Sequence, residues 1–293
     1  MNACVYAAEQ PEFRSFSAGR KWLSDNDDKA WAEKLYLWFI PIFFLISGVY
    51  SRSAWASSSS LLNLMQGVVL WLPYCVIVPL VLRRGTGVPF YRQWWFRFQL
   101  YIAVIVFLLS YFGTEYFFDV LGMRYHYEHV SWYLDSALLG PDQAGALAAD
   151  KRVPLGMYPT TMAFFTLYHV TAIVFVRRIV RATQGLGVAA RRIAYVLALF
   201  AMACFFAFAE TLLFMSAPSK TAWYIDLPTM LTIGTLFYSM DFVCTFPSIY
   251  RLDEDPGRAP WSLGRIVIEA AAAAMGALLL ADLWTLVFGA PFA

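Results

Sequence analysis

Five ionisable side chains lie inside apolar stretches of the sequence, where such groups are costly and often functional. They are Glu115, His169, Glu210, Asp241 and Asp282. No Lys or Arg lies at the same depth in these stretches, so we expect at least one carboxyl group to be a protonated acid at neutral pH. A neutral carboxylic acid in an apolar pocket can act as a general acid. The pattern therefore indicates acid–base chemistry.

Seven apolar stretches could hold these groups inside a membrane, because a helix of roughly 20 residues crosses the hydrocarbon layer. The chain has 293 residues, of which 60% are hydrophobic and 14% charged, and its mean hydropathy is +0.56. We predict spans at 35–50, 61–82, 98–121, 158–176, 193–215, 228–250 and 264–290. The predicted fold class is all-α, a polytopic integral membrane protein with a bundle of about seven transmembrane helices.

The basic residues predict which ends of the helices face the cytoplasm. They gather before the first span and in the connections that follow the second, fourth and sixth spans. We therefore predict a cytoplasmic N-terminus, with 1–33 as a polar cytoplasmic segment and 34–293 as a single transmembrane domain. An extended loop at 122–157 faces the other side and is long enough to form a lid or a short interfacial helix.

Several of these groups also have a structural interpretation. Asp282 could bond an indole, Asp241 could accept from Tyr238 one turn earlier, and His169 could bond a backbone carbonyl. The H-x-E-H run at 126–129 lacks the i, i+4 spacing of a helical metal site. The four cysteines form no CxxC pair, so we expect neither a metal site nor a disulfide framework.

Aromatic side chains accompany the acids along the sequence. Aromatic walls suit a flat polycyclic ligand, and their ring faces stabilise a passing carbocation. We expect the substrate-binding side chains to be Tyr111, Tyr116, Phe118, Tyr168, Trp223 and Tyr238. From the residues alone, the chain is a membrane enzyme or a receptor for an apolar ligand.

Five motifs, in order, resemble the cycloeucalenol cycloisomerase family, also called cyclopropyl sterol isomerases. They are YFGTEYFFDVLG from Tyr111, LYHVTAIVFVRRIVR from Leu167, FAETL from Phe208, FYSMDFVCTFPSIYRLDE from Phe237 and DLW from Asp282. The resemblance extends over 31–291 and implies an isomerase that opens the 9β,19-cyclopropane ring of a sterol such as cycloeucalenol. The product is a Δ8 sterol of the obtusifoliol type, and the reaction needs no cofactor.

The implied reaction requires an acid that protonates C19 and a base that removes the proton from C8. We expect Glu115 or Glu210 to be the acid and Asp241 or His169 to be the base or its relay. Arg251, Asp253 and Glu254 match a family motif at the predicted cytoplasmic end, where we expect an ion pair that locks the helices.

The expected partners are the sterol substrate and membrane lipids, with no nucleic acid. The membrane is the inner membrane of a bacterium or the endoplasmic reticulum of a eukaryote. A sterol-binding or transport protein without catalysis, or another sterol double-bond isomerase, remains the alternative. A seven-helix photoreceptor is disfavoured, because the last span has no lysine for a Schiff base.

Overall fold

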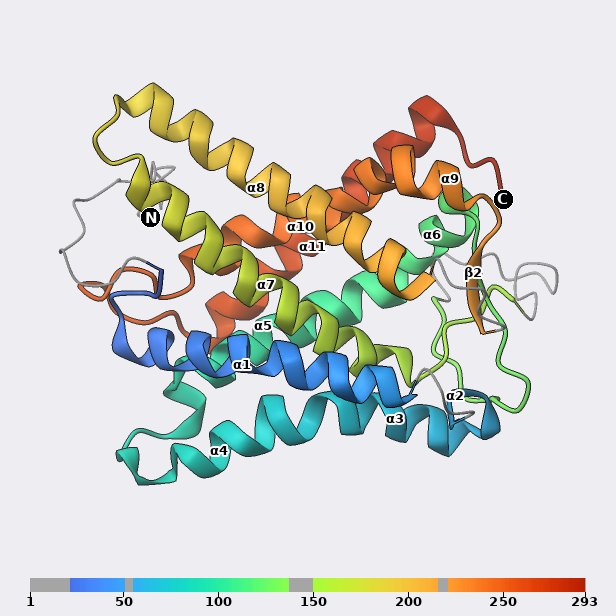
Figure 1. Ribbon diagram of the computed structural model, residues 1–293, viewed down its shortest axis with the longest axis horizontal. Coiled ribbons are helices and arrows are strands. Elements are labelled where there is room, and N and C mark those ends of the chain that lie inside the picture. Colours follow the sequence, from blue (N-terminus) through green and yellow to red (C-terminus); the bar gives the residue numbers. More distant parts are fainter. Residues whose placement is uncertain (1–21, 51–54, 137–149, 216–220, 293) are drawn as a thin grey trace, which may run out of the picture.

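The computed structural model describes residues 22–50, 55–136, 150–215 and 221–292. Helices run side by side along the long axis of the molecule (Figure 1). Seven helical spans are long and apolar enough to cross a membrane: Asp27–Tyr50, Ser60–Thr86, Trp94–Leu121, Met157–Ala182, Val188–Leu213, Leu227–Arg251 and Leu263–Phe288. The predicted seven-helix fold class is therefore confirmed, and the chain is a multi-pass membrane protein.

Three spans are single helices and four are interrupted. The single ones are α1 (Asp27–Tyr50), α7 (Met157–Ala182) and α11 (Leu263–Phe288). The second span contains α3 (Ser60–Leu72), the π-turn η1 (Pro73–Ile77) and α4 (Val78–Leu82), and it follows the short α2 (Trp55–Ser58). The third contains α5 (Trp94–Leu108), the π-turn η4 (Leu109–Gly113) and α6 (Thr114–Leu121). The fifth contains α8 (Val188–Glu210) and the π-turn η5 (Thr211–Met215), and the sixth contains α9 (Leu227–Thr229), the π-turn η6 (Met230–Gly234) and α10 (Thr235–Arg251).

Helix α7 is the most buried of the seven spans. It packs against α1, α3, α5 and α8, while α10 packs against α8 and α11. The outer faces of α8 and α11 expose large apolar side chains, including Ile193, Phe200, Leu279 and Leu286. An apolar surface of this extent is typical of a face that contacts lipid.

Helix α1 begins at Asp27, two turns before the predicted start of the first span. Those turns bury Lys29 and Glu33, which a hydropathy argument assigns to the polar segment at 1–33. Lys29 Nζ lies 2.8 Å from Glu254 Oε2, and Glu33 Oε1 lies 2.6 Å from Arg177 Nη2. Ion pairing at this end therefore allows the helix to extend through a polar stretch.

The expected ion pairing of Arg251, Asp253 and Glu254 is confirmed, with Arg251 Nη2 at 3.7 Å from Glu269 Oε2. Glu254 Oε1 lies 2.5 Å from Arg177 Nε, and Asp253 Oδ2 lies 2.5 Å from Arg97 Nη1. These contacts join α1, α5 and α7 to the chain that follows α10.

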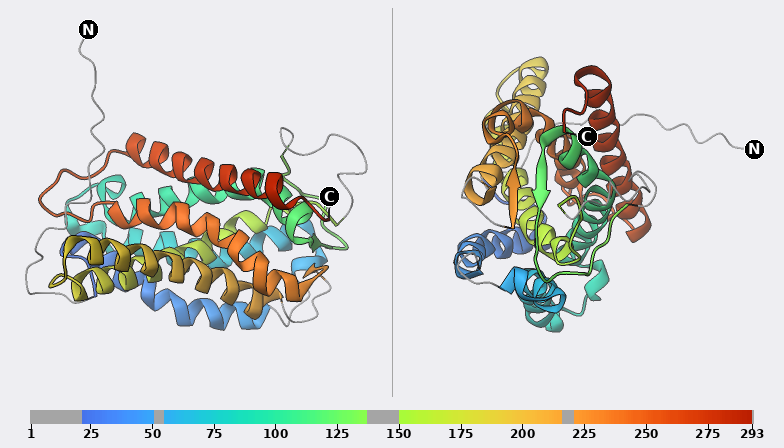
Figure 2. Two further views of the ribbon diagram at one scale, coloured as in Figure 1. Left: turned by 90° about the horizontal axis from the view of Figure 1, so that it is seen from above. Right: turned by 90° about the vertical axis from the view of Figure 1, so that its right-hand side faces the viewer.

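Two short strands close the opposite end of the bundle (Figure 2). They are β1 (Met123–Tyr125) and β2 (Ala222–Tyr224), which pair antiparallel with Met123 opposite Tyr224 and Tyr125 opposite Ala222. The sequence analysis did not predict this pairing. The described parts of the loop at 122–157 form a strand and a bridge between Tyr133 and Pro154, and those parts contain no interfacial helix.

Three of the π-turns, η4, η5 and η6, lie toward this strand-bearing end. A π-turn shifts the helical hydrogen-bond register by one residue and often occurs at a functional site. A threonine hydroxyl bonds a backbone carbonyl at each of them: Thr114 Oγ1 to Ser110 O at 2.7 Å, Thr211 Oγ1 to Ala207 O at 3.0 Å, and Thr235 Oγ1 to Leu231 O at 3.2 Å. Threonine therefore satisfies carbonyl groups where the regular helical pattern is interrupted.

Candidate active site

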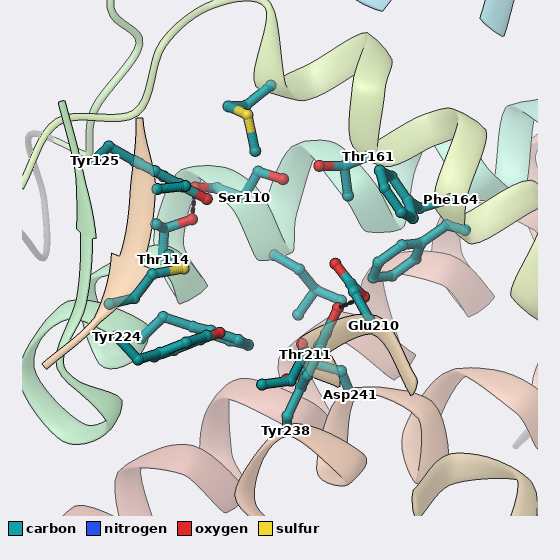
Figure 3. Close-up of a pocket in the computed structure, with 16 residues that line it drawn as sticks. Ser110, Thr114, Tyr125, Thr161, Phe164, Glu210, Thr211, Tyr224, Tyr238 and Asp241 are labelled. Atoms are coloured by element: carbon teal, nitrogen blue, oxygen red, sulfur yellow. Dashed lines mark hydrogen bonds between the residues drawn. The ribbon is translucent and has the colours of Figure 1, made fainter. Parts of the chain in front are cut away.

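A cavity of about 180 Å³ lies between α5–α6, α7, the end of α8, α10 and the two strands (Figure 3). The α7 wall consists of Met157, Thr161, Phe164 and Phe165. Their spacing of i, i+4, i+7 and i+8 places them on one helical face. The cavity therefore lies against the first turns of the most buried helix.

The third span presents Ser110, Thr114 and Phe117 to the cavity. Neighbouring residues on a helix differ by about 100° in direction, so Tyr111, Glu115 and Phe118 share a different face. These three sequence-predicted site residues do not line the cavity. Tyr111 instead stacks on Phe107 with the ring centroids 5.5 Å apart, and Phe118 packs edge-to-face against Tyr125 at 5.8 Å.

The two strands contribute four residues to the cavity lining: Met123, Tyr125, Ala222 and Tyr224. Directly opposed residues of an antiparallel pair share a face, and side chains alternate along each strand. Trp223, a predicted substrate-binding residue, therefore lies on the other face, opposite Arg124. Burial raises the pKa of the Tyr125 and Tyr224 hydroxyls, so both remain neutral on the cavity wall.

Two carboxyl groups line the same cavity, Glu210 at the end of α8 and Asp241 on α10. The Tyr238 hydroxyl donates a hydrogen bond of 2.5 Å to Glu210 Oε2. Tyr238 and Asp241 are three residues apart on α10, so both project from the same side of the helix. The structure thus brings together three of the predicted site residues: Glu210, Asp241 and Tyr238.

The Asp241 carboxyl accepts no hydrogen bond from the residues that the structure describes, whereas Glu210 accepts one from Tyr238. The Tyr168 hydroxyl, one helical turn beyond Phe164, faces Glu210 and interacts with its carboxyl group, but it does not meet the full geometry of a hydrogen bond. The two acids therefore occupy different environments in one cavity.

Glu115 lies outside this cavity, half-buried in the first turn of α6. Its electrostatic neighbours are Asp119, Asp135 and Lys151, and Lys151 Nζ bonds Asp119 Oδ1 at 2.8 Å. The structure separates Glu115 from Glu210, although Thr114 beside it reaches the cavity.

His169 is completely buried and also lies outside the cavity lining. Its Nδ1 is 2.8 Å from Phe165 O and its Nε2 is 2.9 Å from Thr245 Oγ1. The ring stacks on Phe165 and meets Phe246 edge-to-face. Both nitrogens have partners, so the histidine's contacts are those of a packing residue that joins α7 to α10.

Tyr116 and Asp282 form a separate contact near the surface. The Tyr116 hydroxyl lies 3.4 Å from Asp282 Oδ1, and neither residue lines the cavity. Within the described ranges, no cluster of three or more His, Cys, Asp or Glu side chains is arranged to hold a metal ion.

Six polar cavity residues were not among the sequence-predicted site residues: Ser110, Thr114, Tyr125, Thr161, Thr211 and Tyr224. The Gly113-Thr114 pair that closes η4 is a usable signal for the first two, since Thr114 follows the π-turn that contains Ser110. The tyrosines had no such signal, because their position depends on pairing between distant strands.

These features define a class of protein: a multi-pass helical membrane protein with two acids in one aromatic-lined cavity. The chain is similar to cycloeucalenol cycloisomerase of Arabidopsis thaliana, with 27% identity over 271 residues, 92% of this chain and 89% of the relative. This similarity confirms the resemblance to that family found in the motifs. No protein-family model and no solved structure matches the chain.

Proposed function

We propose that the chain is a sterol isomerase that opens a 9β,19-cyclopropane ring, converting a cycloeucalenol-type sterol to a Δ8 sterol of the obtusifoliol type. The observation that carries the proposal is the placement of Glu210 and Asp241 in one aromatic-lined cavity. The similarity to a relative named for this reaction supports it. The substrate reaches the site from the membrane that surrounds the helices, either a bacterial inner membrane or the endoplasmic reticulum.

In this proposal Asp241 is the acid and Glu210 is the base. A carboxylate gains more than a carboxylic acid from accepting a hydrogen bond, and Glu210 is the one that accepts from Tyr238. Asp241 lacks a described donor and is the better site for the proton. Glu115 and His169, the other sequence-predicted candidates, lie outside the cavity and take no direct part.

In the reaction the sterol gains one proton at C19 and loses one proton from C8. The Asp241 O–H bond breaks as its proton adds to C19, the C9–C19 bond opens and positive charge develops at C9. Glu210 then removes the proton from C8, and the C8–H electrons form the C8–C9 double bond. No oxidant or reductant is consumed, and transfer of the proton from Glu210 back to Asp241 restores the starting state.

The surroundings of the acids suit a cationic intermediate. The rings of Phe117, Phe164 and Phe165 line the cavity, and aromatic faces attract a cation. The Glu210 carboxylate supplies the opposite charge in a site of low dielectric constant, where such stabilisation is large. The lining contains no Lys or Arg that would repel the cation.

The test is to supply purified chain in lipid with cycloeucalenol in D₂O and to identify the product by mass spectrometry and NMR. We expect a ring-opened Δ8 sterol with one deuterium in the new methyl group. A shifted double bond with the ring intact would indicate another sterol isomerase. Binding of the sterol without any product would indicate a binding or transport protein.

A further inference from the structure

Two aliphatic hydroxyl groups in the cavity have no assigned role and no hydrogen-bond partner among the described residues, as is also true of the Tyr125 phenol. Ser110 and Thr161 both line it, and neither side chain makes a hydrogen bond with the residues that the structure describes. Ser110 is only 9% exposed. Thr161 is partly exposed, so both hydroxyls open onto the cavity and can bond a polar group held there.

Other hydroxyls of α7 and α10 bond the backbone of their own helix. Thr171 Oγ1 donates to Leu167 O at 2.8 Å, and Ser239 Oγ donates to Leu236 O at 2.8 Å. Thr114, which also lines the cavity, donates to Ser110 O. Ser110 and Thr161 therefore differ from their neighbours in keeping both donor and acceptor free.

The two hydroxyls project from different helices toward the same part of the cavity (Figure 3). Ser110 comes from the π-turn η4 and Thr161 from α7, whereas Tyr238 and Asp241 come from α10. In the same view the α10 side chains lie apart from the two hydroxyls. The cavity thus carries Asp241 on one side and the two hydroxyls on another, and in this view Glu210 lies between them.

We infer that Ser110 and Thr161 bind the hydroxyl group on the terminal ring of the sterol and so determine specificity. The inference rests on the proposed function, which sets the reacting ring beside Glu210 and Asp241. A sterol hydroxyl can donate to one of these side chains and accept from the other. Anchoring that hydroxyl fixes the skeleton so that the cyclopropane ring meets the acids.

The size of the cavity agrees with this arrangement. Pockets that enclose a drug-sized ligand measure roughly 300–1,000 Å³, and this cavity measures about 180 Å³. Only part of a sterol fits inside it. The hydroxyl-bearing ring and the adjoining reactive ring are the part that needs polar contacts, and the apolar remainder can extend among the helices.

The experiment compares kcat/KM for cycloeucalenol with that for its 3-deoxy analogue. We expect the wild-type chain to prefer the hydroxylated sterol by roughly tenfold, the size of one or two neutral hydrogen bonds. The Ser110→Ala/Thr161→Val double variant should lose that preference. The matched Ser239→Ala/Thr171→Val variant should keep it, because those hydroxyls bond only their own helices.

The outcomes separate this inference from the proposed function. If the double variant converts sterol and retains the wild-type preference, the hydroxyl site is overturned and the isomerase stands. If the wild-type chain converts neither sterol, the proposed isomerase function is wrong. The hydroxyl site is then tested by equilibrium binding of both sterols, measured by tryptophan fluorescence. Preference for the hydroxylated sterol that disappears in the double variant supports the site, and equal binding of the two sterols overturns it.

Discussion

The Tyr238 hydroxyl donates a 2.5 Å hydrogen bond to Glu210 Oε2, which joins α10 to the end of α8 at the cavity wall. Asp241 follows Tyr238 by one turn of the same helix. Helix α10 therefore supplies one acid directly and controls the environment of the other.

Replacing this donor should slow the chemical step. We expect Tyr238→Phe to lower kcat by roughly tenfold or more with little change in KM, since hydrogen bonds to charged groups contribute about 1.5–3 kcal/mol. Tyr74→Phe is the matched control, because its hydroxyl donates to Leu35 O at 3.0 Å outside the cavity. Wild-type turnover by Tyr238→Phe would show that the hydrogen bond does not assist the base.

Glu115→Gln should retain activity, although the sequence places this residue among the candidate acids. Glu115 is turned away from the cavity wall formed by Ser110, Thr114 and Phe117. Turnover of cycloeucalenol, normalised to folded protein, is the measurement. Complete loss of activity in a folded Glu115→Gln variant would transfer the role of acid to Glu115.

The ion pairs at the opposite end should determine stability and leave the chemistry unchanged. Arg177 bonds Glu33 Oε1 at 2.6 Å and Glu254 Oε1 at 2.5 Å. Removing one partner of a buried ion pair typically costs about 3–5 kcal/mol, so Arg177→Gln should lower the thermal unfolding midpoint in detergent substantially. The neighbouring cation, Arg178, packs over the Trp22 ring, and Arg178→Gln should have a much smaller effect. Equal losses in the two variants would contradict this account.

The same cluster predicts a loss of stability in acid. Burial alone would raise the pKa of Glu254, but Arg177 and Lys29 outweigh it and lower that pKa from 4.5 to about 2. A depressed folded-state pKa contributes stability that is present above pH 4.5 and is lost as the pH falls toward about 2. The unfolding midpoint, measured at several pH values over that range, should fall more steeply in the wild type than in Glu254→Gln; parallel curves would refute the assignment.

Hydropathy predicted all seven spans, because crossing a membrane requires only length and apolar composition. Glu210 and Asp241 were recognisable as site candidates for a similar reason, since each is an ionisable residue among apolar neighbours. The hydrogen-bond partners of a residue could not be predicted from the sequence. The Nε2 atom of His169 bonds Thr245, 76 residues later in the chain, and this contact indicates a packing role.

The rest of the cavity depends on details that sequence periodicity does not contain. The π-turn η4 contains Ser110 and interrupts the regular helix before Thr114 and Phe117, the other two residues of that cavity face. The pairing of β1 with β2 turns Tyr224 toward the cavity and Trp223 away from it. Three residues on each strand are too few to show an alternating pattern, so the strands were not predicted.

The central claim is that Glu210 and Asp241 carry out the proton transfers. The most direct test measures cycloeucalenol turnover by Glu210→Gln and Asp241→Asn, with Asp282→Asn as the matched control outside the cavity. General acid–base groups typically contribute 10²–10⁴-fold, so each cavity variant should lose roughly 10²-fold or more of kcat while the control stays close to the wild-type rate. Wild-type turnover by both folded cavity variants would contradict the account.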